Sequence, residues 1–150
     1  MNKNYYPVVI IGGGQAGLAM SWHLTQKKIH HIVLERYQLA WAWRHQRWEN
    51  FCLVTPNWQC KLPGFPYDGT QPHGFMLRDE IIDYIVRYAQ SFGAPLREGV
   101  NVERVTRCGE EFKLQTSAGE FTAGQVVVAV GNYHRPRFPE ISASLPQHIV

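Results

Sequence analysis

The stretch Val8-Val9-Ile10-Ile11-Gly12-Gly13-Gly14-Gln15-Ala16-Gly17 decides the fold of this chain. Residues 8–11 are apolar and β-branched, which is typical of a strand buried on both faces of a parallel sheet. Residues 18–27 then predict a helix with one apolar face. Residues 31–34 form a second strand-like run that ends at Glu35. The sequence therefore predicts a strand–helix–strand unit of about 30 residues.

Three glycines in this stretch fit the G-x-G-x-x-G pattern of a dinucleotide-binding loop. Gly12 allows a tight turn, Gly14 lets the backbone approach a pyrophosphate, and Gly17 lets the helix pack close to the sheet. The helix N-terminus adds free N–H donors and a partial positive charge. We therefore expect the whole loop to bind a pyrophosphate, through Gly12, Gly13, Gly14, Gln15, Ala16 and Gly17.

Glu35 follows Gly17 by 18 residues and stands at the end of the second strand, where a carboxylate can accept hydrogen bonds from ribose hydroxyls. The alternative is an ordinary exposed acid at a strand end. Arg36 either favours a 2′-phosphate, lies over an adenine or points into solvent. This first unit of the fold fits FAD or a nicotinamide cofactor.

Residues 36–75 show neither helical nor strand periodicity, yet they contain Trp41, Trp43, Trp48 and Trp58. An irregular segment of this length is uncommon in a compact domain and is usually functional when it is ordered. Its aromatic content favours order over a flexible linker.

The second half of the chain returns to regular patterns. Residues 77–92 predict a helix with an apolar face, stopped by Gly93. Three short segments with hairpin spacing predict an antiparallel meander, at 100–106, 111–116 and 120–122. Residues 125–130 predict a final apolar strand. The expected fold class is α/β, a Rossmann-type domain whose parallel sheet carries an inserted antiparallel β-meander.

The composition narrows the class of protein. A chain of 150 residues with 45% hydrophobic and 18% charged residues is long enough for one domain with a core. Its net charge of +3 is mild and its basic residues are scattered, so no nucleic-acid partner is expected. The apolar runs are too short to span a membrane, and the start lacks a signal-peptide pattern.

Three cysteines, Cys52, Cys60 and Cys108, form no disulfide framework and no zinc-ligand spacing. We therefore expect a cytoplasmic protein with no metal site. A homo-oligomer remains open.

Several motifs carry a family resemblance: the loop 12–17, Glu35, Trp43-Arg44, the segments 53–58 and 62–66, Arg78-Asp79-Glu80, the strand 126–130, Gly131 and Pro136. In these the sequence resembles the N-terminal part of class B flavoprotein monooxygenases. It is most similar to bacterial flavin-containing monooxygenase-like oxidoreductases, often labelled flavoproteins of potassium transport. The resemblance covers essentially the whole chain.

The resemblance implies FAD as the ligand of the glycine loop, NADPH as reductant, molecular oxygen as oxidant and a small organic molecule as substrate. It implies that the loop holds the pyrophosphate and Glu35 the adenosine ribose. It also assigns further positions along FAD: Trp43 and Arg44 on the ribityl–flavin side, Thr55 to Asn57 at the isoalloxazine, the Val102 backbone at the adenine, and Ala129 and Gly131 at a strand end close to the cofactor. No catalytic side chain is assigned, because the flavin itself carries the difficult step.

Two positions depart from the family pattern. Ala40 stands where the Gly-x-x-Trp-Arg stretch has its glycine, and a missing glycine costs stability if the turn needs a positive φ. Val130 replaces a common threonine and so lacks a hydroxyl.

The chain is also short for this family. We expect residues 1–150 to be the FAD-binding N-terminal portion, without the NADPH-binding loop and the C-terminal segment that completes the FAD site. Such a portion is expected to be inactive alone. Two alternatives remain: a non-catalytic module that binds FAD weakly or not at all, and the nicotinamide-binding domain of a dehydrogenase.

Overall fold

A computed structural model describes residues 4–133 and 137–146. Pro136, one of the motif residues, lies outside these ranges. The described elements, in chain order, are β1 (Tyr5–Ile11), α1 (Gln15–Gln26), β2 (His31–Leu34), α2 (Trp41–His45), a 3-10 helix (Asn57–Gln59), β3 (Lys61–Leu62), β4 (Phe65–Pro66), α3 (Arg78–Ser91), β5 (Leu96–Arg97), β6 (Val102–Cys108), β7 (Glu111–Thr116), β8 (Gly119–Val128) and a second 3-10 helix (Glu140–Ser144).

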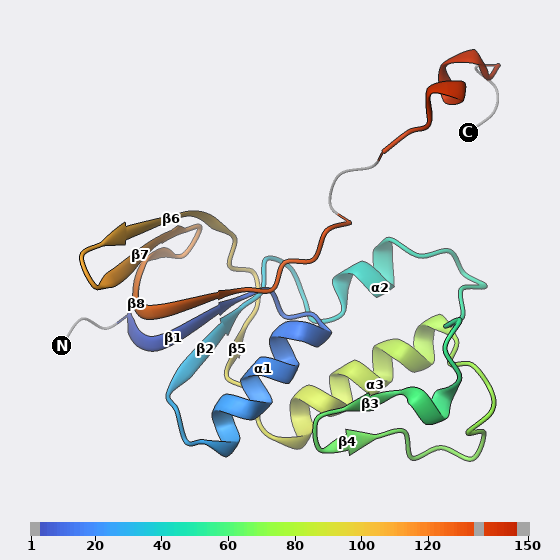
Figure 1. The fold of residues 1–150 in the computed structure, drawn as a ribbon, viewed down its shortest axis with the longest axis horizontal. Helices are drawn as coiled ribbons and strands as arrows, with labels where there is room; N and C mark the ends of the chain where they lie inside the picture. The colour runs from blue at the N-terminus through green and yellow to red at the C-terminus, as the bar shows by residue number, and fades with distance from the viewer. Residues whose placement is uncertain (1–3, 134–136, 147–150) are drawn as a thin grey trace.

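A six-stranded sheet in the order β5-β2-β1-β8-β7-β6 forms the centre of the molecule (Figure 1). β1 pairs in parallel with β2 on one side and with β8 on the other. Val9 and Ile10 of β1 have no exposed surface. Their β-branched side chains are buried on both faces, which is the reason the parallel strands read as unbroken apolar runs. The predicted fold class is confirmed.

The boundaries near the C-terminal strand differ from the prediction. Residues 120–122 and 125–130 were expected to be separate strands, but they form one strand, β8, which ends at Val128. Its first half pairs antiparallel with β7 and its second half in parallel with β1. Residues 123–124 continue the extended backbone without a reversal, so β6 and β7 extend the sheet from one edge. The meander is therefore continuous with the parallel strands.

The two longer helices share one core. Leu18 of α1 packs in the same buried cluster as Ile81, Ile85 and Tyr88 of α3. α1 begins at Gln15, three residues before the predicted start, so that Gly17 lies inside the helix. α3 matches its predicted range within one residue at each end. β5, of two residues, was not predicted, because a pair of residues shows no periodicity.

α3 also orders the aromatic segment 36–77. The Tyr84 hydroxyl accepts the Leu62 N–H at 3.2 Å and donates to the Phe65 carbonyl at 2.5 Å. Burial raises the pKa of Tyr84. Its hydroxyl thus fixes the β3–β4 hairpin to the helix, which accounts for order in a segment with little regular structure.

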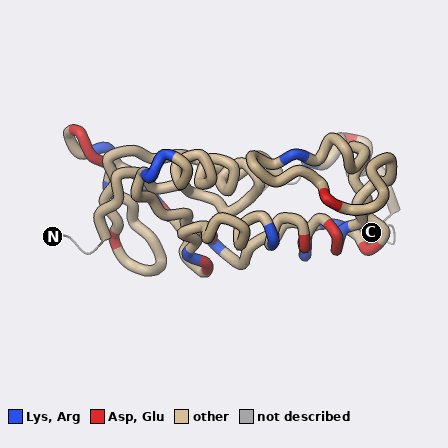
Figure 2. Tube along the Cα trace, turned by 90° about the horizontal axis from the view of Figure 1, so that it is seen from below, with Lys and Arg blue, Asp and Glu red and all other residues tan. Residues whose placement is uncertain are grey.

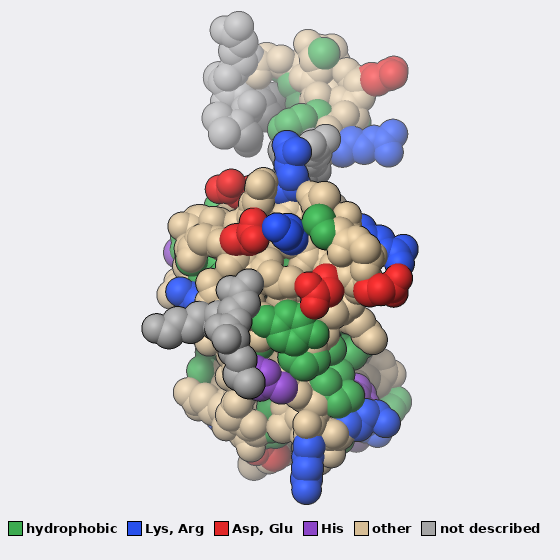
Figure 3. All heavy atoms as spheres, turned by 90° about the vertical axis from the view of Figure 1, so that its left-hand side faces the viewer, with side chains coloured by type: hydrophobic (Ala, Val, Ile, Leu, Met, Phe, Trp, Pro, Cys, Tyr) green, Lys and Arg blue, Asp and Glu red, His purple; other side chains and the backbone are tan. Residues whose placement is uncertain are grey.

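The surface is mixed in character. Acidic and basic residues are interspersed along the chain (Figure 2), and apolar side chains gather between charged ones on the face shown in Figure 3. Large apolar side chains are exposed above all in two segments: Trp48, Val54, Trp58, Phe75 and Leu77 in the first, and Val128, Val130, Tyr133, Phe138, Ile141 and Leu145 in the second.

The three cysteines, Cys52, Cys60 and Cys108, are free thiols. Among the described helices, none has the length and apolarity that crossing a membrane requires.

Candidate functional site

The turn between β1 and α1 is built on close backbone approaches. Gly12 has φ +107°, and a Cβ there would lie 2.5 Å from the Ala129 carbonyl oxygen. The Gly12 N–H donates to the Leu34 carbonyl at 2.9 Å, and the Ala129 N–H donates to the Ile11 carbonyl at 2.8 Å. The structure therefore brings the carboxyl ends of β1, β2 and β8 together at Gly12.

In the same turn, Gly17 lies at a close approach to the backbone, whereas Gly14 borders open space. A Cβ on Gly17 would lie 2.0 Å from the Gly12 carbonyl oxygen, so only glycine lets α1 pack this close to the turn. A Cβ on Gly14 would meet nothing within 4 Å. Gly14 therefore faces open space beside the N-terminus of α1.

Within residues 4–133 and 137–146, no side chain caps the N-terminus of α1. Gly14 provides no capping side chain, and the first turn holds no acidic residue. Gln15 and Ala16 are exposed. The first N–H groups of a helix need acceptors from outside the helix, and its dipole favours an anion there. The turn can therefore take a phosphate group without displacing a protein side chain.

Glu35 closes one side of this turn. Its Oε2 accepts the Gly13 N–H at 2.7 Å, and its Oε1 accepts the Tyr37 N–H at 3.0 Å. The residue is half-buried, so the alternative of an ordinary exposed acid is wrong. Each carboxylate oxygen still has a second lone pair with which it can accept a hydroxyl hydrogen. Arg36 is exposed, with its guanidinium 4.5 Å from the centre of the Tyr37 ring.

The remaining residues assigned to the adenine side and the strand end lie around this turn. The Val100 N–H donates to the Glu35 carbonyl at 2.9 Å, and Val102 follows two residues later as a half-buried residue of β6. Gly131, with φ +73°, comes two residues after Ala129 and is exposed. The structure thus brings the glycine loop, Glu35 and Ala129 together, whereas Val102 and Gly131 follow Val100 and Ala129 by two residues each.

Trp43 and Arg44 lie on α2, which follows a left-handed turn. Ala40 has φ +61° and ψ +23°. The turn does use a positive φ, so the alanine at this position adopts a conformation that the family's glycine would adopt without strain. Trp43 is half-buried, its ring centre 5.7 Å from that of Phe51. Arg44 is exposed and donates through Nε to the Leu39 carbonyl at 3.4 Å.

The Asn57 side chain forms hydrogen bonds to backbone groups of its own loop. The residue is 3% exposed, its Nδ2 donates to the Gln71 carbonyl at 2.9 Å, and its Oδ1 accepts the Met76 N–H at 2.7 Å. Thr55 lies two residues before it and is half-buried. The Asn57 side chain therefore serves as a link within the loop.

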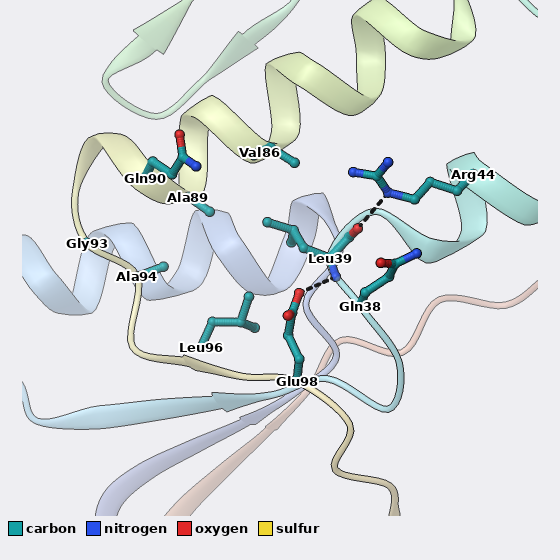
Figure 4. A pocket seen from close by; sticks show the side chains of 10 residues that line it. All are labelled: Gln38, Leu39, Arg44, Val86, Ala89, Gln90, Gly93, Ala94, Leu96 and Glu98. Carbon is teal, nitrogen blue, oxygen red and sulfur yellow. Dashed lines mark hydrogen bonds between the residues drawn. The ribbon is translucent and has the colours of Figure 1, made fainter.

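Glu98 is a further polar residue near Arg44, one that the sequence did not predict. Its Oε1 accepts the Leu39 N–H at 2.6 Å, across 59 residues of sequence. Figure 4 shows this carboxylate and Arg44 on the rim of a surface hollow of about 510 Å³ between α3, β5 and the segment before α2. No motif includes Glu98 and β5 was not predicted, so nothing in the local sequence could have singled it out.

Comparison with known proteins adds a family match. The family model described as pyridine nucleotide-disulphide oxidoreductase matches residues 9–150. An uncharacterized CzcO-like oxidoreductase of Geobacillus kaustophilus is 37% identical over 95% of this chain and 40% of its own length. An indole-3-pyruvate monooxygenase of Oryza sativa is 32% identical over 88% of this chain and 33% of its own length.

Solved structures show the same fold. A flavin-containing monooxygenase from Stenotrophomonas maltophilia superposes with a TM-score of 0.82 at 28% identity, over 91% of this chain and 42% of that protein. A bacillithiol disulfide reductase from Staphylococcus aureus gives a TM-score of 0.84 at 17% identity, over 95% of this chain and 44% of that one, and shows the fold alone. The resemblance to flavin-containing monooxygenase-like oxidoreductases is confirmed. The chain spans less than half the length of each of these four proteins.

Proposed function

Because this chain belongs to the pyridine nucleotide-disulphide oxidoreductase family, we propose that it is the FAD-binding portion of a flavin-dependent monooxygenase-like oxidoreductase. One observation carries the proposal. The helix N-terminus beside Gly14 is open and uncapped, while the neighbouring Gly13 N–H is held by the Glu35 carboxylate. A phosphate site and a ribose acceptor thus stand next to each other, as one dinucleotide requires.

The residues of the turn fit FAD in defined roles. The free N–H groups at the start of α1 would bind the pyrophosphate, and the second lone pairs of Glu35 would accept the ribose hydroxyls. Trp43, Arg44 and Thr55 would lie toward the flavin, with Val102 at the adenine and Ala129 and Gly131 along the cofactor. FAD, when bound, would supply the redox chemistry, with electrons from NADPH and molecular oxygen as oxidant. The protein would exclude water and orient a small organic substrate.

The NADPH-binding part is proposed to lie outside residues 1–150. The relatives are more than twice as long as their matched portions, which would accommodate it. The exposed apolar side chains of Val54 and Val128, with 93% and 67% of their surface accessible, would suit contact with such a part. The three free thiols fit work in a reducing compartment such as the cytoplasm.

A nicotinamide-binding domain is the second candidate. It shares the first strand–helix–strand unit. The strand that leads from the antiparallel extension into residues 129–131 beside Gly12 favours FAD, because the resemblance places this strand end against that cofactor.

A titration separates these candidates. Purified chain is expected to be yellow, or to quench the fluorescence of added FAD on binding it. Protein that binds NADPH but not FAD would overturn the proposal in favour of a nicotinamide-binding domain. Protein that binds neither would favour a non-catalytic module.

The isolated chain should not oxidise NADPH, even when loaded with FAD. Absorbance at the nicotinamide band, followed with and without added FAD, measures this directly. Flavin-dependent NADPH oxidation by residues 1–150 alone would contradict the placement of the NADPH site elsewhere.

A further inference from the structure

Glu98 lies at the end of a short ladder that joins two stretches far apart in sequence. The Glu35 N–H donates to the Arg97 carbonyl at 3.0 Å, and the Gly99 N–H donates to the Tyr37 carbonyl at 2.9 Å. The Leu39 N–H continues this pattern, but its acceptor is the Glu98 side chain at 2.6 Å. The carboxylate therefore holds the chain at the point where it leaves the sheet for α2.

The backbone beyond Leu39 needs such a support. Ala40 adopts the left-handed conformation, which strains any residue that carries a Cβ. Its carbonyl accepts the N–H groups of Trp43 and Arg44 at 3.0 and 3.1 Å. The orientation of α2 thus depends on this turn. A hydrogen bond to an ionised carboxylate is about twice as strong as a neutral one and can offset the cost.

Glu98 supports the turn without neutralising Arg44. Figure 4 shows the carboxylate and the guanidinium on opposite sides of Leu39, with Arg44 extending over the hollow. Among the described residues, Arg44 forms no ion pair. Within the described part of the chain, its one hydrogen bond runs from Nε to the Leu39 carbonyl. Its terminal nitrogens therefore keep their donors for a ligand.

We propose that Glu98 is a positioning residue for cofactor binding. It fixes the turn at Leu39 and Ala40, and through that turn it orients Trp43 and Arg44 toward the flavin side while leaving the guanidinium charge available. This inference rests on the proposed FAD site and adds a residue that no motif of the chain contains.

The test compares FAD binding by three variants of the full chain. E98A removes the acceptor, E98Q keeps an uncharged oxygen acceptor, and E80A is the matched control. Glu80 also accepts one backbone N–H, that of Leu77 at 2.8 Å, but at the start of α3. FAD fluorescence quenching gives the dissociation constant, and thermal melting reports the stability of each variant.

We expect E98A to weaken FAD binding about tenfold, which corresponds to about 1.4 kcal/mol. E98Q should recover most of this loss, to within about threefold of wild type. E80A should lower the melting temperature and leave FAD affinity unchanged.

Two results would overturn the inference alone: wild-type affinity in E98A, or equal weakening by E98A and E80A, which would show a general effect of stability. Failure of the wild-type chain to bind FAD would overturn the proposed function, and this inference with it.

Discussion

The glycine turn at residues 12–17 and the segment 36–77 both border the candidate site, but different forces hold them. In the glycine turn, backbone touches backbone: a Cβ on Gly17 would strike the Gly12 carbonyl, and a Cβ on Gly12 would strike that of Ala129. In the segment 36–77, side chains from distant elements hydrogen-bond to the backbone: Glu98 to Leu39, and Tyr84 to the β3–β4 hairpin.

The contrast is clearest at two of their positive-φ residues, Gly12 and Ala40. Gly12 adopts φ +107° at no steric cost, whereas Ala40 adopts φ +61° with a side chain. The first turn is therefore specified by its own residues. The second depends on partners that the fold brings to it.

Gly17→Ala is expected to have the largest effect. Its methyl group would need the 2.0 Å space next to the Gly12 carbonyl, where no flexible side chain can move away. We expect a loss of about 3 kcal/mol in the free energy of unfolding, or no folded protein at all. Urea unfolding followed by circular dichroism measures it. Near wild-type stability would contradict the tight approach of α1 to the turn.

Tyr84 and Tyr88 test the side-chain support from α3. Tyr88 is fully buried, and its hydroxyl has no hydrogen-bond partner among the described residues. Y88F should therefore stabilise the protein by about 1 kcal/mol at neutral pH, because it removes an unsatisfied polar group. Y84F, which loses the bonds to the hairpin, should destabilise it by about 2 kcal/mol. Destabilisation by Y88F would show that its hydroxyl is bonded after all.

Tyr88 should also make stability depend on alkaline pH. Burial raises the pKa of Tyr88 to about 12 from its ordinary value of 10.0. Between these values the unfolded chain loses the phenolic proton and the folded chain keeps it. Deprotonation therefore favours unfolding, and Tyr88 should contribute a fall in stability of about 1.4 kcal/mol per pH unit between pH 10 and about pH 12, where the folded form also deprotonates. In Y88F this contribution should vanish in unfolding curves recorded across that range.

Ala40→Gly should have the smallest effect. Relief of the left-handed strain should raise the free energy of unfolding by about 1–2 kcal/mol. The lost methyl burial costs about 0.8 kcal/mol, and the freer unfolded chain costs about 0.4–1 kcal/mol. These terms nearly cancel, so the free energy of unfolding should stay within about 0.8 kcal/mol of wild type.

Ala89→Gly is the matched control, since both alanines are buried, at 7% and 6% exposure, but Ala89 lies inside α3. It should cost about 2 kcal/mol. Equal losses in the two variants would contradict the strain assigned to Ala40.

The same contrast explains what the sequence could predict. The glycine turn, Glu35 and the parallel strands follow from local patterns: Gly12 and Gly17 are required by close backbone approaches, and the apolar runs mark the buried strands. The continuity of β8 was missed because its two halves pair with different neighbours, β7 and β1, and each half resembles a separate strand. Glu98 was missed because its role arises only when β5 and Leu39 meet in the fold.

The most direct test of the FAD site is a titration of Gly14→Ala with FAD. The new methyl group would meet no protein atom within 4 Å, and the φ of −74° at this position suits alanine, so the melting temperature should equal that of wild type. The methyl group would occupy the space through which the pyrophosphate approaches the backbone. We expect at least about tenfold weaker FAD binding in a stably folded protein, a difference of about 1.4 kcal/mol. Unchanged FAD affinity in Gly14→Ala would contradict the pyrophosphate site at this turn.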